Sequence, residues 1–278
     1  MLQVIHVILL KVLNLKRLDK NPKISIITIC YNSEKYIDKC IQSVVNQSYE
    51  NKEYIIIDGG SFDATLQIID KYKEHVDCII SEPDNGISDA FNKGIRKSTG
   101  DVIVFINSDD QLYENALNIF SEYYDPHIDV YCGNVILWNS VTNYKALGKA
   151  LMKIPHIPFN YRVWHQAVYI SKSAYNRYGV YNKKIKYIMD LDLVMRMYQN
   201  KAKFKAIPKV LAVFQLGGVS QDSSSKLWQE RQQVILNNGG NKFHVFVWLT
   251  YLRLRTFIKK VLNACGEDFR LRFVNKKV

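Results

Sequence analysis

The strongest constraint on the fold is an alternation of short apolar runs with amphipathic segments along the first part of the chain. The apolar runs are rich in Ile and Val, which predicts buried strands at residues 23–30, 53–57, 78–81 and 102–106. The segments between them carry apolar residues at helical spacing. Strands that alternate with helices predict an α/β fold, with a mainly parallel sheet and helices on both faces.

Three parts of the chain differ in composition. We expect residues 21–222 to form the α/β domain, residues 1–20 to be an amphipathic N-terminal segment, and residues 223–278 to be a basic, amphipathic helical tail. The alternation weakens beyond about residue 125. The elements predicted there are strands at 130–137, 167–170 and 210–214, and a helix at 190–199.

The net charge of +12 is concentrated at the two ends of the chain. Residues 1–20 hold four basic groups and one acid, and residues 241–278 hold nine basic groups and two acids, so the rest contributes only +2. A nearly neutral central part argues against nucleic acid as a partner and favours ends that touch an anionic surface. Both ends fit peripheral contact with a membrane, and packing of their apolar residues against the domain is the alternative.

The cysteines and the apolar segments bear on the compartment. The five cysteines are odd in number and have no metal-type spacing, so we interpret them as free thiols in a reducing compartment. No run reaches the roughly 18 apolar residues of a membrane-spanning helix. The apolar start lacks the basic beginning and cleavage site of a signal peptide. These features predict a cytoplasmic protein, with a peripheral position on the inner face of the cytoplasmic membrane suggested by the basic ends.

Polar segments follow the first two predicted strands, at the edge where open parallel sheets bind ligands. Their polar residues and glycine are Thr28, Tyr31 and Asn32, then Asp58, Gly60, Ser61 and Asp63. A glycine lets the backbone approach a ligand, Asp58 can accept a hydrogen bond from a base or a ribose, and Tyr31 can stack on a ring. Turns are often rich in Gly, Ser and Asp, so each segment alone also fits an ordinary turn. No Gly-x-Gly-x-x-Gly follows the first strand, which disfavours the usual dinucleotide-binding fold.

A third polar segment opens the helix predicted at residues 87–97. Asp89, Asn92 and Lys93 stand at positions i, i+3 and i+4, so they are expected on one helix face. Such a face can hold a ribose or a diphosphate. A solvated face with an Asp–Lys pair is the alternative.

Two adjacent acids, Asp109 and Asp110, come directly after the apolar run 102–106. Like charges side by side repel unless a cation lies between them. A divalent ion with oxygen ligands satisfies such a site and can also bind a substrate diphosphate. An acidic turn is the alternative.

The last candidates lie in the second half of the chain. Asp190 begins a predicted helix, where it fits either an N-cap or a general base that takes a proton from an acceptor hydroxyl. Asp192 is two positions further, and its side chain diverges from that of Asp190 by about 200°. His165 fits a metal ligand, a phosphate contact or a structural histidine, and Gln166 follows it.

These segments, in this order, resemble the family 2 glycosyltransferases with the GT-A fold. The matching residues are Ile24-Ser25-Ile26-Ile27-Thr28-x-Cys30-Tyr31-Asn32, Asp58-Gly59-Gly60-Ser61-x-Asp63, Asp84-x-Gly86-x-x-Asp89-Ala90-x-Asn92-Lys93-Gly94, Ser108-Asp109-Asp110 and Asp190-x-Asp192-Leu193-x-x-Arg196. The pair His165-Gln166 and the run Gly217-Gly218-Val219-Ser220 resemble a bacterial subgroup that builds surface polysaccharides. The resemblance covers about residues 23–220 and is more specific in its first half.

The resemblance implies an inverting transfer of a sugar from a nucleoside diphosphate to a hydroxyl of a saccharide or lipid-linked acceptor. It implies Mg²⁺ or Mn²⁺ on Asp110, with Asp109 on the metal or the ribose and His165 as a further candidate ligand. Asp190 is the implied base; Met189 stands where many members have Glu, so Asp192 stays a candidate too. The residues implied in substrate binding are Thr28, Tyr31, Asn32, Asp58, Gly60, Ser61, Asp63, Asp84, Asp89, Asn92, Lys93, Asp109, Gln166 and Gly218.

Other functions need features that this sequence lacks or does not use. A nucleotide-binding oxidoreductase needs a Gly-rich first turn, and a nucleotidyltransferase needs a Gly- and Arg/Lys-rich loop after the first strand; neither is present. A non-catalytic nucleotide- or sugar-binding module would not need the three aspartates 109, 110 and 190. UDP-hexose or UDP-N-acetylhexosamine is the default donor by resemblance, and GDP- and dTDP-sugars stay open.

Overall fold

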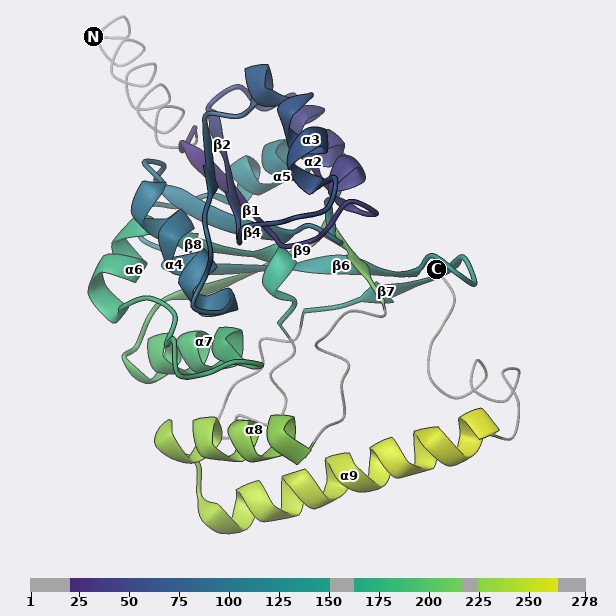
Figure 1. Ribbon diagram of the computed structural model, residues 1–278. Coiled ribbons are helices and arrows are strands. Elements are labelled where there is room, and N and C mark those ends of the chain that lie inside the picture. Colours follow the sequence, from purple (N-terminus) through teal and green to yellow (C-terminus); the bar gives the residue numbers. More distant parts are fainter. Residues whose placement is uncertain (1–20, 151–162, 217–224, 265–278) are drawn as a thin grey trace, which may run out of the picture.

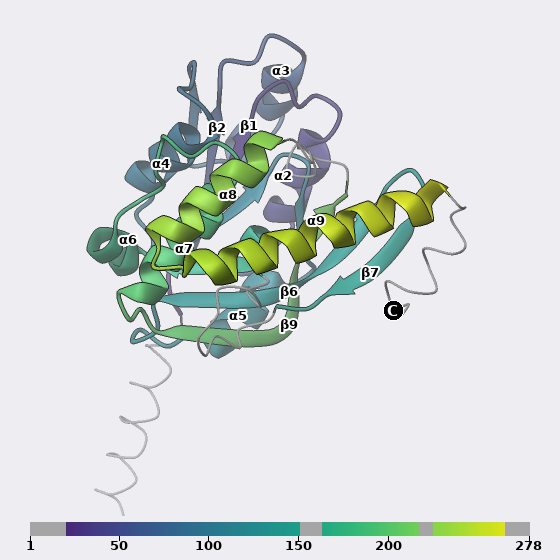
Figure 2. The ribbon, with the colours of Figure 1, turned by 90° about the horizontal axis from the view of Figure 1, so that it is seen from below.

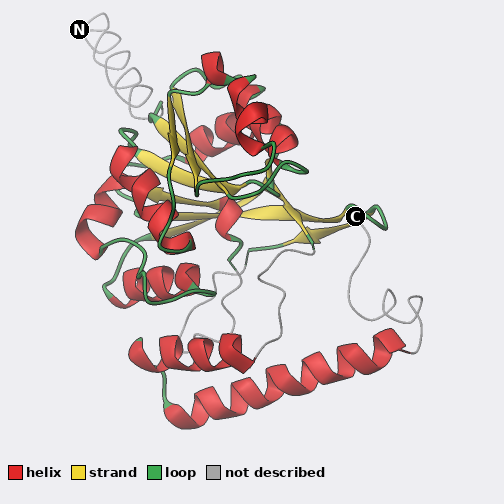
Figure 3. Cartoon of the chain, in the orientation of Figure 1, coloured by secondary structure: helices red, strands yellow, loops and turns green. Residues whose placement is uncertain are grey.

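The computed structural model of the protein describes residues 21–150, 163–216 and 225–264 (Figure 1). The predicted N-terminal segment 1–20 and the run 217–220, which includes Gly218, lie outside the described residues. Within them, nine strands form one sheet, with helices on both of its faces (Figure 3). The predicted α/β class is confirmed.

The strands run in the order β3-β2-β1-β4-β8-β6-β9-β5, and β7 pairs with β6. They are β1 (Ile24–Cys30), β2 (Lys52–Asp58), β3 (Cys78–Ser81), β4 (Val102–Asn107), β5 (Gln111–Leu112), β6 (Val130–Asn139), β7 (Tyr144–Gly148), β8 (Val168–Ser171) and β9 (Phe204–Gln215). The first four strands are parallel neighbours, as the alternation predicts. In the second half only β6 and β9 pair in parallel, and β5, β7 and β8 join antiparallel.

Two helical layers cover the sheet. The helices are α2 (Ile37–Val45), α3 (Thr65–Asp70), α4 (Ile87–Lys97), α5 (Ala116–Tyr123), α6 (Lys172–Tyr178), α7 (Met189–Gln199), α8 (Ser225–Asn237) and α9 (Lys242–Ala264), with short 3₁₀ turns at Lys73–His75 and His165–Ala167. Helices α2, α3 and α5 share one buried apolar cluster, and α4, α6 and α7 share another. The Ile-rich β1 serves both, because Ile26 and Ile27 point to opposite faces of the sheet.

Helix α4 lies unusually close to the sheet. Its Gly94 faces β1, where an added Cβ atom would stand 2.5 Å from Ile27 Cγ2. A side chain at this position would push the helix away from the strand. The glycine therefore allows α4 to pack closely on β1. This packing also sets the position of the loop that leads into the helix.

The chain ends in two helices that pack as a further layer. Helix α8 lies against α7, and α9 lies against α8 (Figures 1 and 2). A third apolar cluster joins them through Ile188 and Met195 on the α7 side, Val234 and Ile235 on α8, and Val245 on α9. The segment predicted as a separate tail is thus attached to the domain through α7. None of the helices in the described residues is long and apolar enough to cross a membrane.

Candidate active site

The polar segments after β1, β2 and β4 meet at one edge of the sheet. Register brings them together, because Cys30 lies beside Asp58 and Ile29 beside Asn107. Side chains then tie the loops: the Asn32 backbone N–H donates to Ser61 Oγ at 2.8 Å, and the Ser33 and Ser108 hydroxyls lie 2.8 Å apart. The three loops therefore lie side by side at the carboxyl ends of their strands.

Asp58 organises the loop after β2. Its side chain is fully buried and accepts hydrogen bonds from the backbone N–H groups of Gly60 and Ser61 and from the hydroxyls of Ser61 and Ser81. Gly60 sits at φ +82°, a conformation that favours glycine. Direct contact of Asp58 with a nucleoside stays a prediction, and it requires one of these hydrogen bonds to be released.

Thr28 does not lie in the site. It is fully buried, and its hydroxyl is 3.0 Å from Tyr54 Oη and 3.6 Å from Cys40 Sγ, beneath the helix α2. The expectation of a direct nucleoside contact is therefore wrong. Thr28 is two residues before the strand ends and its side chain alternates into the core, so only the residues after Cys30 reach the edge.

Two exposed aromatic rings stand beside this loop. Tyr31 is 58% exposed and Phe62 is 82% exposed, and their ring centroids are 6.2 Å apart in an edge arrangement. The Phe62 backbone N–H donates to Asn32 Oδ1 at 3.1 Å, while Asp63 accepts from the Thr65 and Glu34 backbone N–H groups. An exposed ring pair at a strand end suits a flat base. Sequence reasoning singled out Tyr31 but passed over Phe62, although it stands inside the Asp58–Asp63 segment.

The polar residues of α4 do not form a free face. Asp89 is buried and pairs with Lys183 at 2.5 Å, and Asn92 exchanges two hydrogen bonds with the backbone of Tyr181. Lys93 pairs with Asp84 at 2.6 Å. The ion pair with Lys183 lowers the pKa of Asp89, although burial opposes it. These side chains fasten the loops around the site, so any contact with ribose or diphosphate stays a prediction.

Asp109 and Asp110 follow β4 and lie in a poorly solvated position. Asp110 is buried, and its two oxygens accept hydrogen bonds from Gln166 Nε2 at 2.7 Å and from the Gln215 backbone N–H at 3.0 Å. Burial, and then the neighbouring Asp109, raise the pKa of Asp110 well above its usual range. Burial also raises the pKa of the half-buried Asp109. Gln166 thus positions Asp110, a different role from the substrate contact expected of it.

The metal expectation can be tested against these oxygens. In the described part of the chain no three His, Cys, Asp or Glu side chains gather into a metal site, so Asp109, Asp110 and His165 do not form the predicted set. Asp110 is turned toward Gln166 and Gln215. Mg²⁺, however, usually takes only one or two carboxylates and completes its shell with phosphate oxygens and water. One buried and one half-buried carboxyl side by side, Asp110 and Asp109, fit the number of carboxylates that such a cation takes.

The structure separates Asp190 from Asp192. Asp192 is buried, pairs with Arg196 at 2.9 Å and accepts a hydrogen bond from Asn238 Nδ2 at 3.3 Å, so it holds α7 and the end of α8 together. Asp190 is half-buried and lines a cavity of about 190 Å³. Of the two candidates left open by the sequence, only Asp190 can meet a ligand there.

Two more polar side chains line that cavity, His165 and Arg231. Burial lowers the pKa of His165, and the charges of Asp190 and then Asp109 oppose that shift. Its buried Nε2 has no hydrogen-bond partner among the described residues. Burial also lowers the pKa of Arg231, and Asp190 opposes the shift. Aliphatic side chains form most of the rest of the cavity wall, together with the four aromatic rings of Phe105, Tyr175, Tyr181 and Tyr187.

The helix α8 contributes more than Arg231. The carboxylate of Glu230 accepts hydrogen bonds from three successive backbone N–H groups, at 2.7 Å from Lys186, 2.7 Å from Tyr187 and 3.2 Å from Ile188. These groups lead into α7, directly before Asp190, where a carboxylate also matches the helix dipole. No motif in the sequence marked Glu230 or Arg231, because both come from a helix some 40 residues further along the chain, which only packing brings to the site.

Comparison of the sequence with known families and proteins gives a consistent result. A sequence model described as "Glycosyl transferase family 2" matches residues 25–185. A PGL/p-HBAD biosynthesis glycosyltransferase of Mycobacterium bovis is 27% identical over 218 residues, covering 76% of this chain and 84% of that protein. A cholesterol galactosyltransferase of Borreliella burgdorferi is 29% identical over 139 residues, covering 49% of this chain and 38% of that protein.

Solved structures show the same fold at lower identity. TarS 1–349 from S. aureus in complex with UDP-GlcNAc has a TM-score of 0.63 and 21% identity, covering 82% of this chain and 70% of that one. The mannosyltransferase PcManGT from Pyrobaculum calidifontis in complex with GDP-Man and Mn²⁺ has a TM-score of 0.60 and 15% identity, covering 89% and 76%. The GT-A fold expected from the sequence is thereby confirmed.

Proposed function

This chain belongs to glycosyl transferase family 2, and we propose that it moves a hexose or an N-acetylhexosamine from a UDP-sugar to a hydroxyl of a saccharide or lipid-linked acceptor. The proposal includes inversion at the anomeric carbon, dependence on Mg²⁺ or Mn²⁺, and a role in building a bacterial surface polysaccharide of the O-antigen or capsule type. TarS with bound UDP-GlcNAc supports a uridine donor. PcManGT with GDP-Man and Mn²⁺ supports a metal and makes a GDP-sugar the competing donor.

One observation carries the proposal. Asp190 lines a cavity that it shares with His165, and the next residue, Gln166, donates a hydrogen bond to Asp110 of the acidic pair at 2.7 Å. A group able to accept a proton therefore lies close to a group suited to hold a diphosphate through a cation. A transferase needs both at one place, since the acceptor is deprotonated while the diphosphate leaves.

The chain's own residues account for the steps of the reaction. Tyr31 and Phe62 bind the base, and the loop after β2 holds the nucleoside. Asp190 accepts the proton of the acceptor hydroxyl as its oxygen bonds to the anomeric carbon from the side opposite the diphosphate. The bond from that carbon to the phosphate oxygen breaks, the electron pair leaves with the nucleoside diphosphate, and the configuration inverts. Arg231 keeps a positive charge beside Asp190, and Glu230 holds the segment that leads to it.

A divalent cation, when bound at Asp109 and Asp110, acts as a Lewis acid that neutralises the leaving diphosphate. Gln166 and the Gln215 backbone then keep Asp110 in one orientation. The largely apolar wall of the cavity limits water beside Asp190, which favours transfer of the sugar over hydrolysis of the donor.

The deciding experiment measures nucleoside diphosphate release from UDP-, GDP- and dTDP-sugars, with Mn²⁺, with Mg²⁺ and with EDTA. Wild type is compared with Asp190→Asn and with a matched control, Asp70→Asn, which makes the same change on the exposed surface of α3. We expect slow, metal-dependent turnover of one donor class, lost in Asp190→Asn and kept in Asp70→Asn. The anomeric configuration of the product, read by NMR, tests inversion.

Two results would contradict the proposal. Saturable donor binding without turnover, for every saccharide and lipid-linked acceptor supplied, would indicate a non-catalytic binding module. No binding of any donor, with either metal, would remove the nucleotide-sugar function altogether.

A further inference from the structure

Helix α9 presents an apolar surface that the domain does not cover. The exposed large apolar side chains on this helix begin with Phe243. The seven that follow it, Phe246, Val247, Tyr251, Leu254, Phe257, Ile258 and Val261, are called here the α9 stripe. Their spacings of three and four residues put them on one side of the helix. Among the side chains of α9 that the structure describes, only Val245 is buried, against α8.

The α9 stripe lies at the outer edge of the molecule. Helix α8 stands between α7 and α9, and α9 runs beyond the end of α8 (Figures 1 and 2). With 23 residues, α9 is about 34 Å long. Single exposed apolar residues are ordinary, but a continuous stripe of this length marks a surface that meets a partner.

The charge of the same helix indicates which partner. Residues 242–264 contain five basic residues and no acid, and both Lys242 and Arg253 are exposed. A second copy of the chain would bring the same five cations against these, which disfavours self-association through α9. An apolar face on a strongly basic helix instead suits the boundary between headgroups and acyl chains of an anionic bilayer.

We propose that α9 is a membrane-docking helix that lies in the plane of an anionic lipid surface, with the α9 stripe in the acyl boundary and the exposed Lys242 and Arg253 on the headgroups. Docking through α9 places α8, and then α7 with Asp190, within about two interhelical distances of 8–10 Å from the lipid. The site then faces acceptors that are carried at the membrane. This inference concerns lipid binding and holds whatever sugar the enzyme transfers.

The test is co-sedimentation of the purified full-length chain with vesicles of phosphatidylcholine alone or with about one third phosphatidylglycerol, which gives the surface a negative potential. We expect at least about tenfold tighter binding to the anionic vesicles, and release from them at about 0.5 M salt because the charges are screened. Phe257→Glu should weaken binding about tenfold or more, since it puts a charge into the acyl boundary. Phe257 is 64% exposed, so the change leaves the core intact.

Val141→Glu is the matched control. It removes an apolar side chain that is 93% exposed and adds the same charge, but in the turn between β6 and β7. A second pair reverses a charge: Arg253→Glu on α9 against Lys97→Glu at the end of α4. Both α9 variants should lose vesicle binding, and both controls should keep it. Circular dichroism checks that all four fold.

Three results would overturn the inference. Wild type that fails to sediment with anionic vesicles would exclude lipid docking. If Phe257→Glu and Val141→Glu lost vesicle binding equally, the added negative charge alone, and not its position on α9, would explain the loss. A concentration-dependent dimer in light scattering, abolished by Phe257→Glu, would assign the α9 stripe to a second copy of the chain.

Discussion

Glu53 near the start of β2 and Asp110 after the end of β4 are both buried carboxylates, and they lie at opposite ends of one sheet. Glu53 accepts hydrogen bonds from the Ser25 hydroxyl, from the Thr99 hydroxyl and backbone N–H and from the Gly100 backbone N–H, and it pairs with Lys23 at 2.9 Å. Asp110 has two hydrogen bonds and an acidic neighbour, and among the described residues no Lys or Arg pairs with it.

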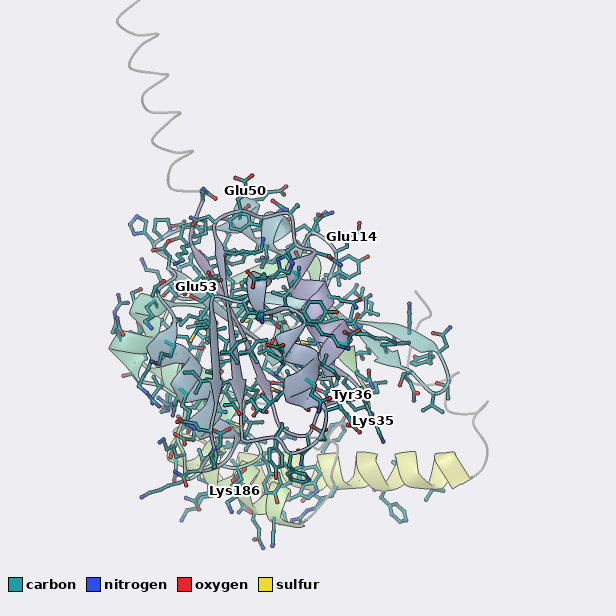
Figure 4. All side chains as sticks on the ribbon, turned by 45° about the horizontal axis from the view of Figure 1, so that its top comes forward. Lys35, Tyr36, Glu50, Glu53, Glu114 and Lys186 are labelled. Atoms are coloured by element: carbon teal, nitrogen blue, oxygen red, sulfur yellow. The ribbon has the colours of Figure 1, made fainter. Side chains whose placement is uncertain are left out.

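The pKa values move in opposite directions as a result. Burial alone would raise the pKa of Glu53, but its hydrogen bonds and Lys23 lower it to about 2. Burial and Asp109 raise the pKa of Asp110. In Figure 4, Glu50 and Glu53 lie toward one end of the molecule, and Tyr36 and Lys186 lie toward the other. At one end of the sheet the fold itself supplies the hydrogen bonds and the cation that stabilise a carboxylate. At the other end Asp110 has fewer partners, and we expect a ligand to supply the rest.

The largest effect is expected from the base at the ligand end. Asp190→Asn should lower kcat by roughly 10²–10⁴-fold, because the acceptor hydroxyl loses its proton acceptor. The melting temperature should stay close to that of wild type. Asp192→Asn should instead affect mainly stability. It breaks the buried pair with Arg196 and should lower the free energy of unfolding by about 3 kcal/mol. If kcat, measured at a temperature where both variants are folded, fell equally in the two, Asp190 would not be the base.

Asp110→Asn tests the comparison most directly. Neutralising a carboxyl whose pKa is raised by burial should stabilise the metal-free protein, by about 2–4 °C for each kcal/mol of unfolding free energy. Gln166 can turn its amide to accept from the new Asn, so the buried contact is kept. Activity should fall by at least about 10²-fold. Thermal scans with and without Mn²⁺ supply the second readout: Mn²⁺ should raise the melting temperature of wild type and leave that of the variant unchanged.

Glu53→Gln tests the other end. The neutral amide cannot satisfy the same donors and leaves Lys23 without its carboxylate, so the free energy of unfolding should fall by about 1–3 kcal/mol. Glu50→Gln is the control, because Glu50 is exposed. Denaturant titration measures both, and kcat at low temperature should be unchanged in each.

The pH dependence has a defined sign at each end. Because the folded pKa of Glu53 lies below its unfolded value of about 4.3, its contribution is present above that value and is lost as the pH falls toward about 2. Asp110 behaves in the opposite way, since protonation favours the folded state. Acid titration of Glu53→Gln should therefore show a smaller loss of stability in this window than wild type shows.

The smallest effect is expected at the exposed rings. Tyr31→Ala and Phe62→Ala should each weaken donor binding by about 1 kcal/mol, roughly fivefold, because a stacked base loses one ring. Calorimetry with the free nucleoside diphosphate measures this without turnover. Both side chains are exposed, so a drop in melting temperature beyond about 2 °C would show that they hold the loops and not the base.

The sequence alone determined the four parallel strands β1 to β4, the edge at which the polar segments gather, and the acidic pair, because strand and helix periods and strand-end positions are local properties. Tertiary structure decided the rest. It put Thr28 in the core, because α2 packs over that face of β1 and brings Cys40 to 3.6 Å from the Thr28 hydroxyl. It also separated Asp190 from Asp192. Asp192 is bound by Arg196 and Asn238, whereas Asp190 lines the cavity. It also brought Glu230 and Arg231 to the site, through the packing of one helix against another, which no spacing along the chain records.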